Sequence, residues 1–142
     1  MTVIAYKDGI MAADGSEWQG NVLTRSNVRK IHRGPCGELF ACSGEISHVA
    51  RFREWVLGGR RDDMPSVNDD FQALLVEPDG TALEFNAGGS AELSTDHAVA
   101  GAHAEFMHGA FIAGASAADV IRLAIERCSY AAGEIQIERL HR

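Results

Sequence analysis

The sequence has 142 residues, of which 46% are hydrophobic and 23% are charged. This length and composition predict one folded domain over residues 1–142 with its own hydrophobic core, and they exclude a disordered chain. The net charge of −7 comes without any Lys/Arg cluster longer than Arg60-Arg61, which argues against a nucleic-acid partner.

The cysteines and the hydropathy pattern predict where the protein works. The three cysteines are odd in number and match no zinc or disulfide spacing, which favours free thiols in a cytoplasmic protein. No apolar run approaches the roughly 18 residues of a membrane helix, and no charged leader precedes an apolar core. We therefore expect neither a membrane partner nor a signal peptide, so that only Met1 precedes the mature N-terminus.

The first third of the chain is predicted to consist of strands. Residues 2–6 and 10–14 form a hairpin whose turn is Lys7-Asp8-Gly9, because Asp-Gly is typical hairpin turn chemistry. Residues 27–32 alternate with period two, which predicts a strand that carries Val28, Lys30 and His32 on one face. A turn cluster at 34–37 leads into an apolar strand over 38–42.

The middle of the chain is predicted to be a helix followed by a hairpin. From Glu45 the apolar residues fall on a helical stripe, with Ser43 placed to cap the helix and Gly58-Gly59 to end it. The charged stretch 60–70 predicts a solvated loop. Strands over 71–77 and 81–86 flank the turn Pro78-Asp79-Gly80.

The last third combines strands and helices. Residues 87–90 are predicted to be a loop, and no Gly-Lys-Ser/Thr follows them to make a phosphate cradle. The predicted elements are a strand over 97–100, helices over 102–113 and 116–130, and a closing strand over 134–140. Ser116 and Asp119 form a capping box for the second helix. The whole order predicts an α+β fold with helices covering antiparallel sheets.

Four sites in the first 45 residues resemble one family. Thr2, Asp14, the run Asn27-Val28-Arg29-Lys30 and the run Ala41-Cys42-Ser43-Gly44 resemble the proteasome β-subunit family of N-terminal-nucleophile hydrolases, which includes the bacterial peptidase HslV and smaller phage-associated relatives. The element order is similar over nearly the whole chain. The resemblance implies a four-layer αββα sandwich.

The resemblance also implies catalytic roles. Thr2 would be the nucleophile and, once Met1 is removed, its own α-amine would be the general base, since such an amine has a pKa of about 8. Lys30 would keep the nucleophile's surroundings electropositive, Asp14 would pair with Lys30, and the Gly44 N–H would face the oxyanion. Without the resemblance, Lys30 is a surface lysine, Asp14 a turn residue and Gly44 a glycine in a tight turn.

Two departures from the family pattern leave two functions open. Ala102 stands where the family usually has a serine that assists the terminal amine, and Ala132 stands where it often has a second serine. One hypothesis is a threonine peptidase that acts on peptides or unfolded proteins, forms a homo-oligomeric ring and works with an AAA+ ATPase partner. The other is an inactive member of the fold that serves as a scaffold or assembly subunit.

Metal chemistry is disfavoured by incomplete motifs. His103-Ala104-Glu105 matches the first half of the zinc deaminase signature, but the Pro-Cys-x-x-Cys half is missing. Glu105 and His108 make one Glu-x-x-His pair, whereas a carboxylate di-metal site needs two such pairs. We therefore expect no metal and no cofactor.

Overall fold

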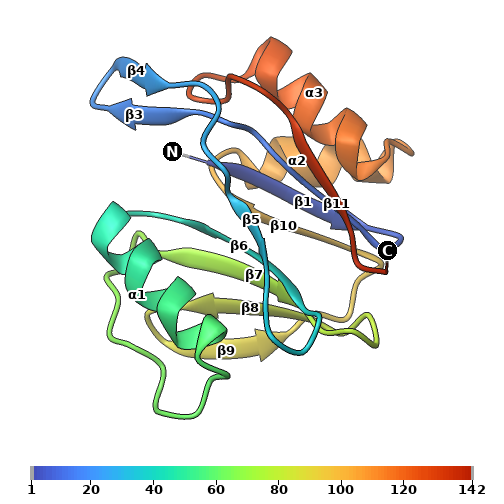
Figure 1. Cartoon of the computed structure of the whole chain (residues 1–142). Helices are drawn as coiled ribbons and strands as arrows, with labels where there is room; N and C mark the ends of the chain where they lie inside the picture. The colour runs from blue at the N-terminus through green and yellow to red at the C-terminus, as the bar shows by residue number, and fades with distance from the viewer. Residues whose placement is uncertain (1, 142) are drawn as a thin grey trace.

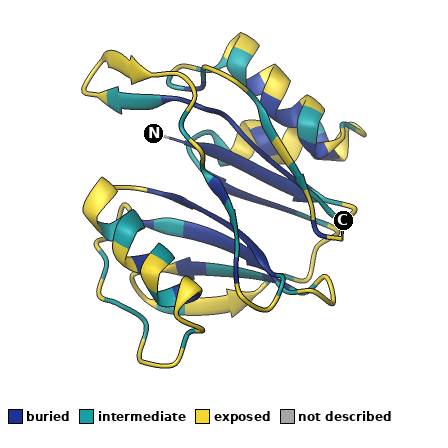
Figure 2. Ribbon diagram, in the orientation of Figure 1, coloured by how far each residue is buried: buried dark blue, intermediate teal, exposed yellow. Residues whose placement is uncertain are grey.

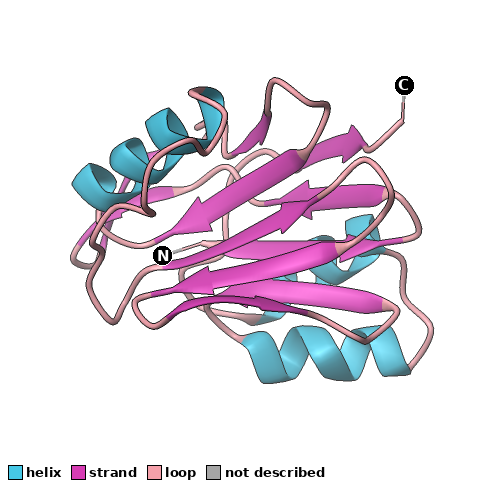
Figure 3. Ribbon diagram, turned by 90° about the horizontal axis from the view of Figure 1, so that it is seen from below, coloured by secondary structure: helices cyan, strands magenta, loops and turns pink. Residues whose placement is uncertain are grey.

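The computed structural model describes residues 2–141 and arranges them as two main antiparallel sheets with helices on their outer sides (Figures 1 and 3). This arrangement of antiparallel strands and three helices confirms the predicted α+β class. The described chain begins at the end of the molecule where the hairpin of strands β3 (Glu17–Gln19) and β4 (Val22–Arg25) faces helix α1 (Ile46–Leu57) (Figure 1).

The first strand of the chain is a central strand of the first sheet. Its strand order is β10-β1-β2-β11, with bounds β1 Val3–Lys7, β2 Ile10–Ala13, β10 His97–Gly101 and β11 Gln136–Arg139. Asp8 and Gly9 both have positive φ, 52° and 76°, in the turn between β1 and β2, which suits a two-residue hairpin loop. Because β1 pairs with β10 on one side and β2 on the other, the backbone next to Thr2 is firmly held.

The strands of the second sheet pair in the order in which they follow one another along the chain. Its order is β5-β6-β7-β8-β9, with bounds β5 Ile31–Arg33, β6 Leu39–Ser43, β7 Gln72–Val76, β8 Ala82–Asn86 and β9 Gly89–Glu92. A separate hairpin joins β3 (Glu17–Gln19) and β4 (Val22–Arg25). The prediction of a loop over 87–90 is wrong for Gly89 and Ser90, because β9 starts at Gly89 and pairs with β8 despite its polar sequence.

The three helices span Ile46–Leu57 (α1), Ala104–Ile112 (α2) and Ala117–Arg127 (α3). The predicted cap of α3 is confirmed, because Ser116 Oγ accepts a hydrogen bond from the Asp119 N–H. The predicted cap of α1 is wrong: Ser43 ends β6, and Glu45 takes the N-cap position without a side-chain bond. Gly58 ends α1 as predicted.

Alternation along the strands divides the core into three apolar clusters. Buried residues are concentrated in the strands of the two sheets, whereas the helices expose one side (Figure 2). One face of β1 and β2 meets the second sheet through side chains such as Ile4, Met11 and Leu74. The opposite face packs against α2 and α3. The outer face of the second sheet packs against α1, with Phe52 at the centre of an aromatic cluster. Period-two burial therefore fills both sides of each sheet.

A glycine allows the end of β10 to approach the first residues of the chain. Gly101 has a φ of 91°, and a Cβ atom built there would lie 1.9 Å from the Thr2 carbonyl oxygen. The next residue, Ala102, donates its N–H to the same oxygen at 2.8 Å. A side chain at position 101 would therefore push Thr2 away from its place.

We expect Gly101→Ala to lower the free energy of unfolding by at least about 2 kcal/mol, since it adds both a backbone clash and a strained φ. Gly109→Ala is the matched control, because a Cβ on this α2 glycine meets nothing within 4 Å. That control should stabilise the protein by roughly 0.5 to 1 kcal/mol through helix propensity. Urea unfolding measures both, and similar values for the two variants would contradict the close approach described above.

Candidate active site

Lys30 reaches the site from an irregular segment. The prediction of a strand over 27–32 is wrong for residues 27–30, because β5 begins only at Ile31. The Lys30 N–H donates instead to Gln136 Oε1 at 2.7 Å, and the Gln136 amide also donates to the Val28 carbonyl. A side chain of β11 thus supplies the bonds that a neighbouring strand would supply, and it fixes the backbone of Lys30.

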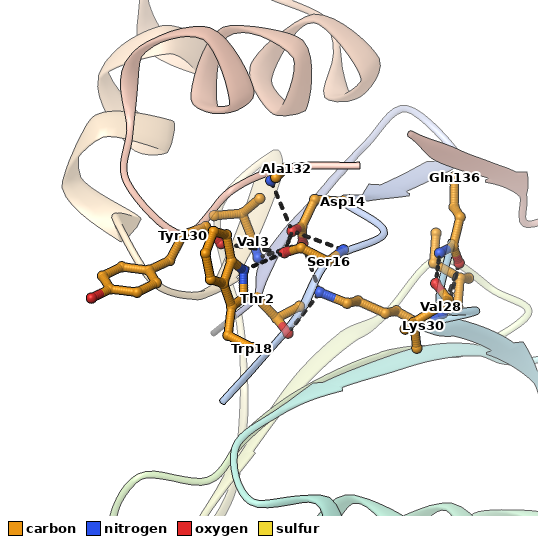
Figure 4. A network of polar contacts seen from close by, with 11 residues as sticks. Thr2, Val3, Asp14, Ser16, Trp18, Val28, Lys30, Tyr130, Ala132 and Gln136 are labelled. Atoms are coloured by element: carbon orange, nitrogen blue, oxygen red, sulfur yellow. Dashed lines mark hydrogen bonds and ion pairs between the residues drawn. The ribbon is translucent and has the colours of Figure 1, made fainter. Parts of the chain in front are cut away.

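Thr2, Lys30 and Asp14 meet at the end of the first sheet where β1 begins and β2 ends (Figure 4). Lys30 Nζ lies 3.0 Å from Thr2 Oγ1 and 2.9 Å from Asp14 Oδ1. All three side chains are largely shielded from solvent; that of Lys30 is 8% exposed and that of Asp14 is 0% exposed. The ammonium group therefore bridges the threonine hydroxyl and a buried carboxylate.

Backbone and side-chain donors surround the Asp14 carboxylate. Oδ1 accepts the Val3 N–H at 3.1 Å in addition to Lys30 Nζ. Oδ2 accepts the Ala132 N–H at 3.3 Å, the Ser16 N–H at 3.4 Å and the Ser16 hydroxyl. A buried carboxylate is tolerated when it is paired and hydrogen-bonded in this way. Asp14 consequently ties four separate segments of the chain to one point.

Burial governs the electrostatics of Lys30. It lowers the pKa of the Lys30 ammonium, and the charge and hydrogen bond of Asp14 oppose this shift only in part. The lysine is thus easier to deprotonate than a surface lysine. In its charged form it donates toward Thr2 Oγ1 and favours the alkoxide over the neutral hydroxyl.

Sequence reasoning missed the residues that support Asp14 from the other side. The Ser16 hydroxyl accepts a hydrogen bond from Trp18 Nε1 at 2.9 Å, and the Trp18 ring packs edge-on against Tyr130. The position of Ser16 two residues after Asp14 was the available signal, because a short polar side chain there can reach the carboxylate. The contribution of Ala132 left no signal, since it comes from a backbone N–H.

Gly44 and Thr2 line the same cavity, which has a volume of about 290 Å³. Gly44 connects β6 to α1 with a φ of 139°, and a Cβ there would lie 3.1 Å from the Phe71 Cα. Thr2 therefore shares its cavity with Gly44 and Ile46 at the start of α1, and backbone N–H groups at a helix N-terminus favour negative charge. This is an arrangement suited to stabilising an oxyanion.

The two departures from the family pattern also lie at this site. Ala102 contacts Thr2 through the backbone bond described above, although α2 starts only at Ala104, after His103 adopts a left-handed conformation. Ala132 contacts Asp14 through its N–H. Each position keeps a backbone contact and lacks the hydroxyl that the sequence resemblance led us to expect there.

The residues of the incomplete metal motifs have other partners. His103 Nε2 lies 2.7 Å from the Ser129 carbonyl oxygen, and His108 Nδ1 lies 3.0 Å from His97 Nε2. Within residues 2–141, no three His, Cys, Asp or Glu side chains are grouped as metal ligands. In the same part of the chain, no helix is long and apolar enough to cross a membrane.

We expect Lys30→Met to lower the free energy of unfolding by about 3 kcal/mol or more, because it leaves the Asp14 carboxylate buried without its cation. Lys7→Met is the matched control, since the Lys7–Asp96 pair is 4.0 Å long and its Asp96 carboxylate is 74% exposed. It should cost less than about 1 kcal/mol. Equal losses for the two variants in urea unfolding would show that the buried Lys30–Asp14 pair contributes no more to the free energy of unfolding than the Lys7–Asp96 pair.

Comparisons with known proteins bear on the fold. No protein-family model and no curated protein matches the sequence. Among solved structures, the chain is similar to a eukaryotic HslV from Trypanosoma brucei, with a TM-score of 0.75, 13% sequence identity, and coverage of 97% of this chain and 98% of that chain. At this identity the likeness concerns the fold, and the chain therefore has an HslV-like fold.

Proposed function

We propose that the protein is a threonine peptidase of the proteasome/HslV-like class, with Thr2 as nucleophile after removal of Met1. The observation that carries the proposal is the contact of Thr2 Oγ1 with Lys30 Nζ, whose ammonium is in turn paired with the buried Asp14. The three apolar clusters between and outside the two sheets support a four-layer αββα sandwich.

The reaction follows from this geometry. The Thr2 hydroxyl attacks a peptide carbonyl and gives its proton to the Thr2 α-amine, so that a C–O bond forms and the carbonyl oxygen becomes an anion. The Gly44 N–H stabilises that anion, and Lys30 stabilises the developing alkoxide. The C–N bond then breaks, and the leaving amine takes the proton from the α-amine. Water, deprotonated by the same amine, hydrolyses the ester on Thr2 and restores the hydroxyl.

A second candidate function is an inactive scaffold subunit with the same fold. The observation that favours it is the absence of a hydroxyl at Ala102, whose backbone contacts Thr2. Positioning of a general base matters as much as its pKa, so a poorly oriented amine would leave the site with little activity.

We further propose that copies of the chain assemble into a closed ring, with an AAA+ ATPase as a possible partner. Large apolar side chains support an interface on the outer helices: Ile112 of α2 is 81% exposed, and Phe106 and Leu123 are also exposed. Large exposed apolar side chains on surface helices are candidates for protein contacts. A ring would also separate an open N-terminal nucleophile from other proteins.

Thr2→Ala should abolish turnover of a fluorogenic peptide while leaving the fold unchanged, because it removes the attacking oxygen. Thr2→Ser, which keeps a hydroxyl, should retain part of the activity, and Thr81→Ala in the β7–β8 turn should retain all of it. Intact mass must first show that the purified protein has lost Met1. Equal turnover by the wild type and Thr2→Ala would refute the assignment of Thr2.

Ala102→Ser tests whether the protein is a weakened peptidase or a scaffold. A hydroxyl at this position would orient the Thr2 amine, and we expect peptide turnover to rise about tenfold, which corresponds to roughly 1.4 kcal/mol in the barrier. Ala104→Ser, at the first residue of α2, is the control for adding a hydroxyl nearby. If Met1 is absent and neither the wild type nor Ala102→Ser exceeds background turnover, the scaffold function replaces the peptidase.

A further inference from the structure

The cavity beside Thr2 has a charge opposite to that of the whole protein. The chain carries a net charge of −7, yet three arginines line this cavity: Arg25 at the end of β4, Arg29 before β5, and Arg53 in the middle of α1. Lys30 adds a fourth cation, and Glu17 is the one acidic side chain in the lining. The cavity therefore attracts anionic groups, and Arg side chains suit carboxylates in particular.

Arg53 differs from the other two arginines in its burial, because Arg25 and Arg29 are exposed. It is half-buried, and none of the ion pairs formed within residues 2–141 involves Arg53, Arg29 or Arg25. Elsewhere in the same part of the chain, half-buried Arg60 is paired with both Glu38 and Glu77. An arginine cannot lose its charge in a protein, so Arg53 presents an uncompensated cation to the cavity.

Two neighbouring groups respond to the same charges. Burial lowers the pKa of His32, and the charges of Arg53 and then Arg29 lower it further. Burial raises the pKa of Cys42 to about 12, with Arg53 acting in the opposite direction. Both residues line the cavity together with Arg53.

The rest of the lining suits the stem of a side chain. Val28, Val49 and Ala50 give the cavity apolar lining, and Thr2 lines the same cavity. When Thr2 Oγ1 attacks a peptide carbonyl, the side chain of the residue that carries this carbonyl starts two bonds from the attacked carbon. It must therefore lie next to Thr2, where the apolar lining receives its methylenes and the arginines receive its head group.

We propose that this cavity selects peptides with an acidic side chain, glutamate or aspartate, on the residue whose carbonyl Thr2 attacks. The preference for an acidic group rests on the cavity, whereas its place next to the cleaved bond rests on the peptidase function proposed above. A glutamate carboxylate at this position would form a charge-assisted hydrogen bond with Arg53, which a neutral glutamine of the same shape would not form.

The test uses matched peptides with blocked ends that differ only in having Glu, Gln or Lys at the selected position. We expect the Glu peptide to bind about tenfold more tightly than the Gln peptide, as measured by anisotropy of a labelled peptide. A coumarin amide series with the same residues should show the same order in kcat/KM. Blocked ends ensure that the side chain, and not a terminal carboxylate, is measured.

Variants of one helix provide the controls. Arg53→Gln should remove the preference for Glu over Gln, and Arg53→Glu should shift it toward the Lys peptide. Arg51→Glu changes the net charge equally on the same helix, but Arg51 is exposed and does not line the cavity, so this variant should keep the Glu preference. Thermal unfolding of each variant establishes that it is folded.

The outcomes separate the two proposals. Selective binding of the Glu peptide without any turnover would support the acidic-side-chain cavity and contradict the peptidase. Turnover without a preference for Glu, or a preference that Arg53→Glu leaves unchanged, would contradict the cavity assignment alone. Failure of the Glu peptide to bind more tightly than the Gln peptide would also overturn it.

Discussion

The buried ion pair between Asp14 and Lys30 is the interaction on which the site depends. A fully buried carboxylate is stable in a fold only if hydrogen-bond donors surround it. The donors to Asp14 come from four places in the chain: Val3, Ser16, Lys30 and Ala132. The segments must therefore meet at one point. Lys30 also contacts the Thr2 hydroxyl, so the ammonium group that neutralises Asp14 also positions the proposed nucleophile.

The sheets supply the rigid frame around this ion pair. Strand β1 is buried on both faces, with Ile4 directed to the second sheet and Val3 to helices α2 and α3. The residue that precedes it, Thr2, is consequently held by packing as well as by the bond from Ala102. A catalytic group on such an element loses little entropy when substrate binds, which is the benefit of a site built on strands.

The charge of the cavity beside Thr2 differs from that of the protein as a whole. The protein surface as a whole is acidic, but the walls beside Thr2 are basic because β4, the segment before β5, and α1 each contribute an arginine. A half-buried cation without a carboxylate partner is costly to hold, so the place of Arg53 in the cavity wall is better explained by a ligand than by stability. Arg53 lies on α1, the helix that begins two residues after Gly44, so the proposed oxyanion donor and the proposed substrate preference depend on the same helix.

The sequence by itself determined the local structure and the members of the proposed catalytic set. Asp8-Gly9 predicted its hairpin and Ser116 its helix cap, because turn and cap chemistry depends on residues a few positions apart. The resemblance to the family identified Thr2, Asp14, Lys30 and Gly44. Tertiary structure alone decided that Lys30 lies outside a strand, that an Ala132 N–H binds Asp14 across 118 positions, and that Arg53 faces the cavity. A backbone donor has the same chemistry in every residue except proline, and the direction of an arginine on a helix depends on what packs beside it, so neither leaves a local pattern in the sequence.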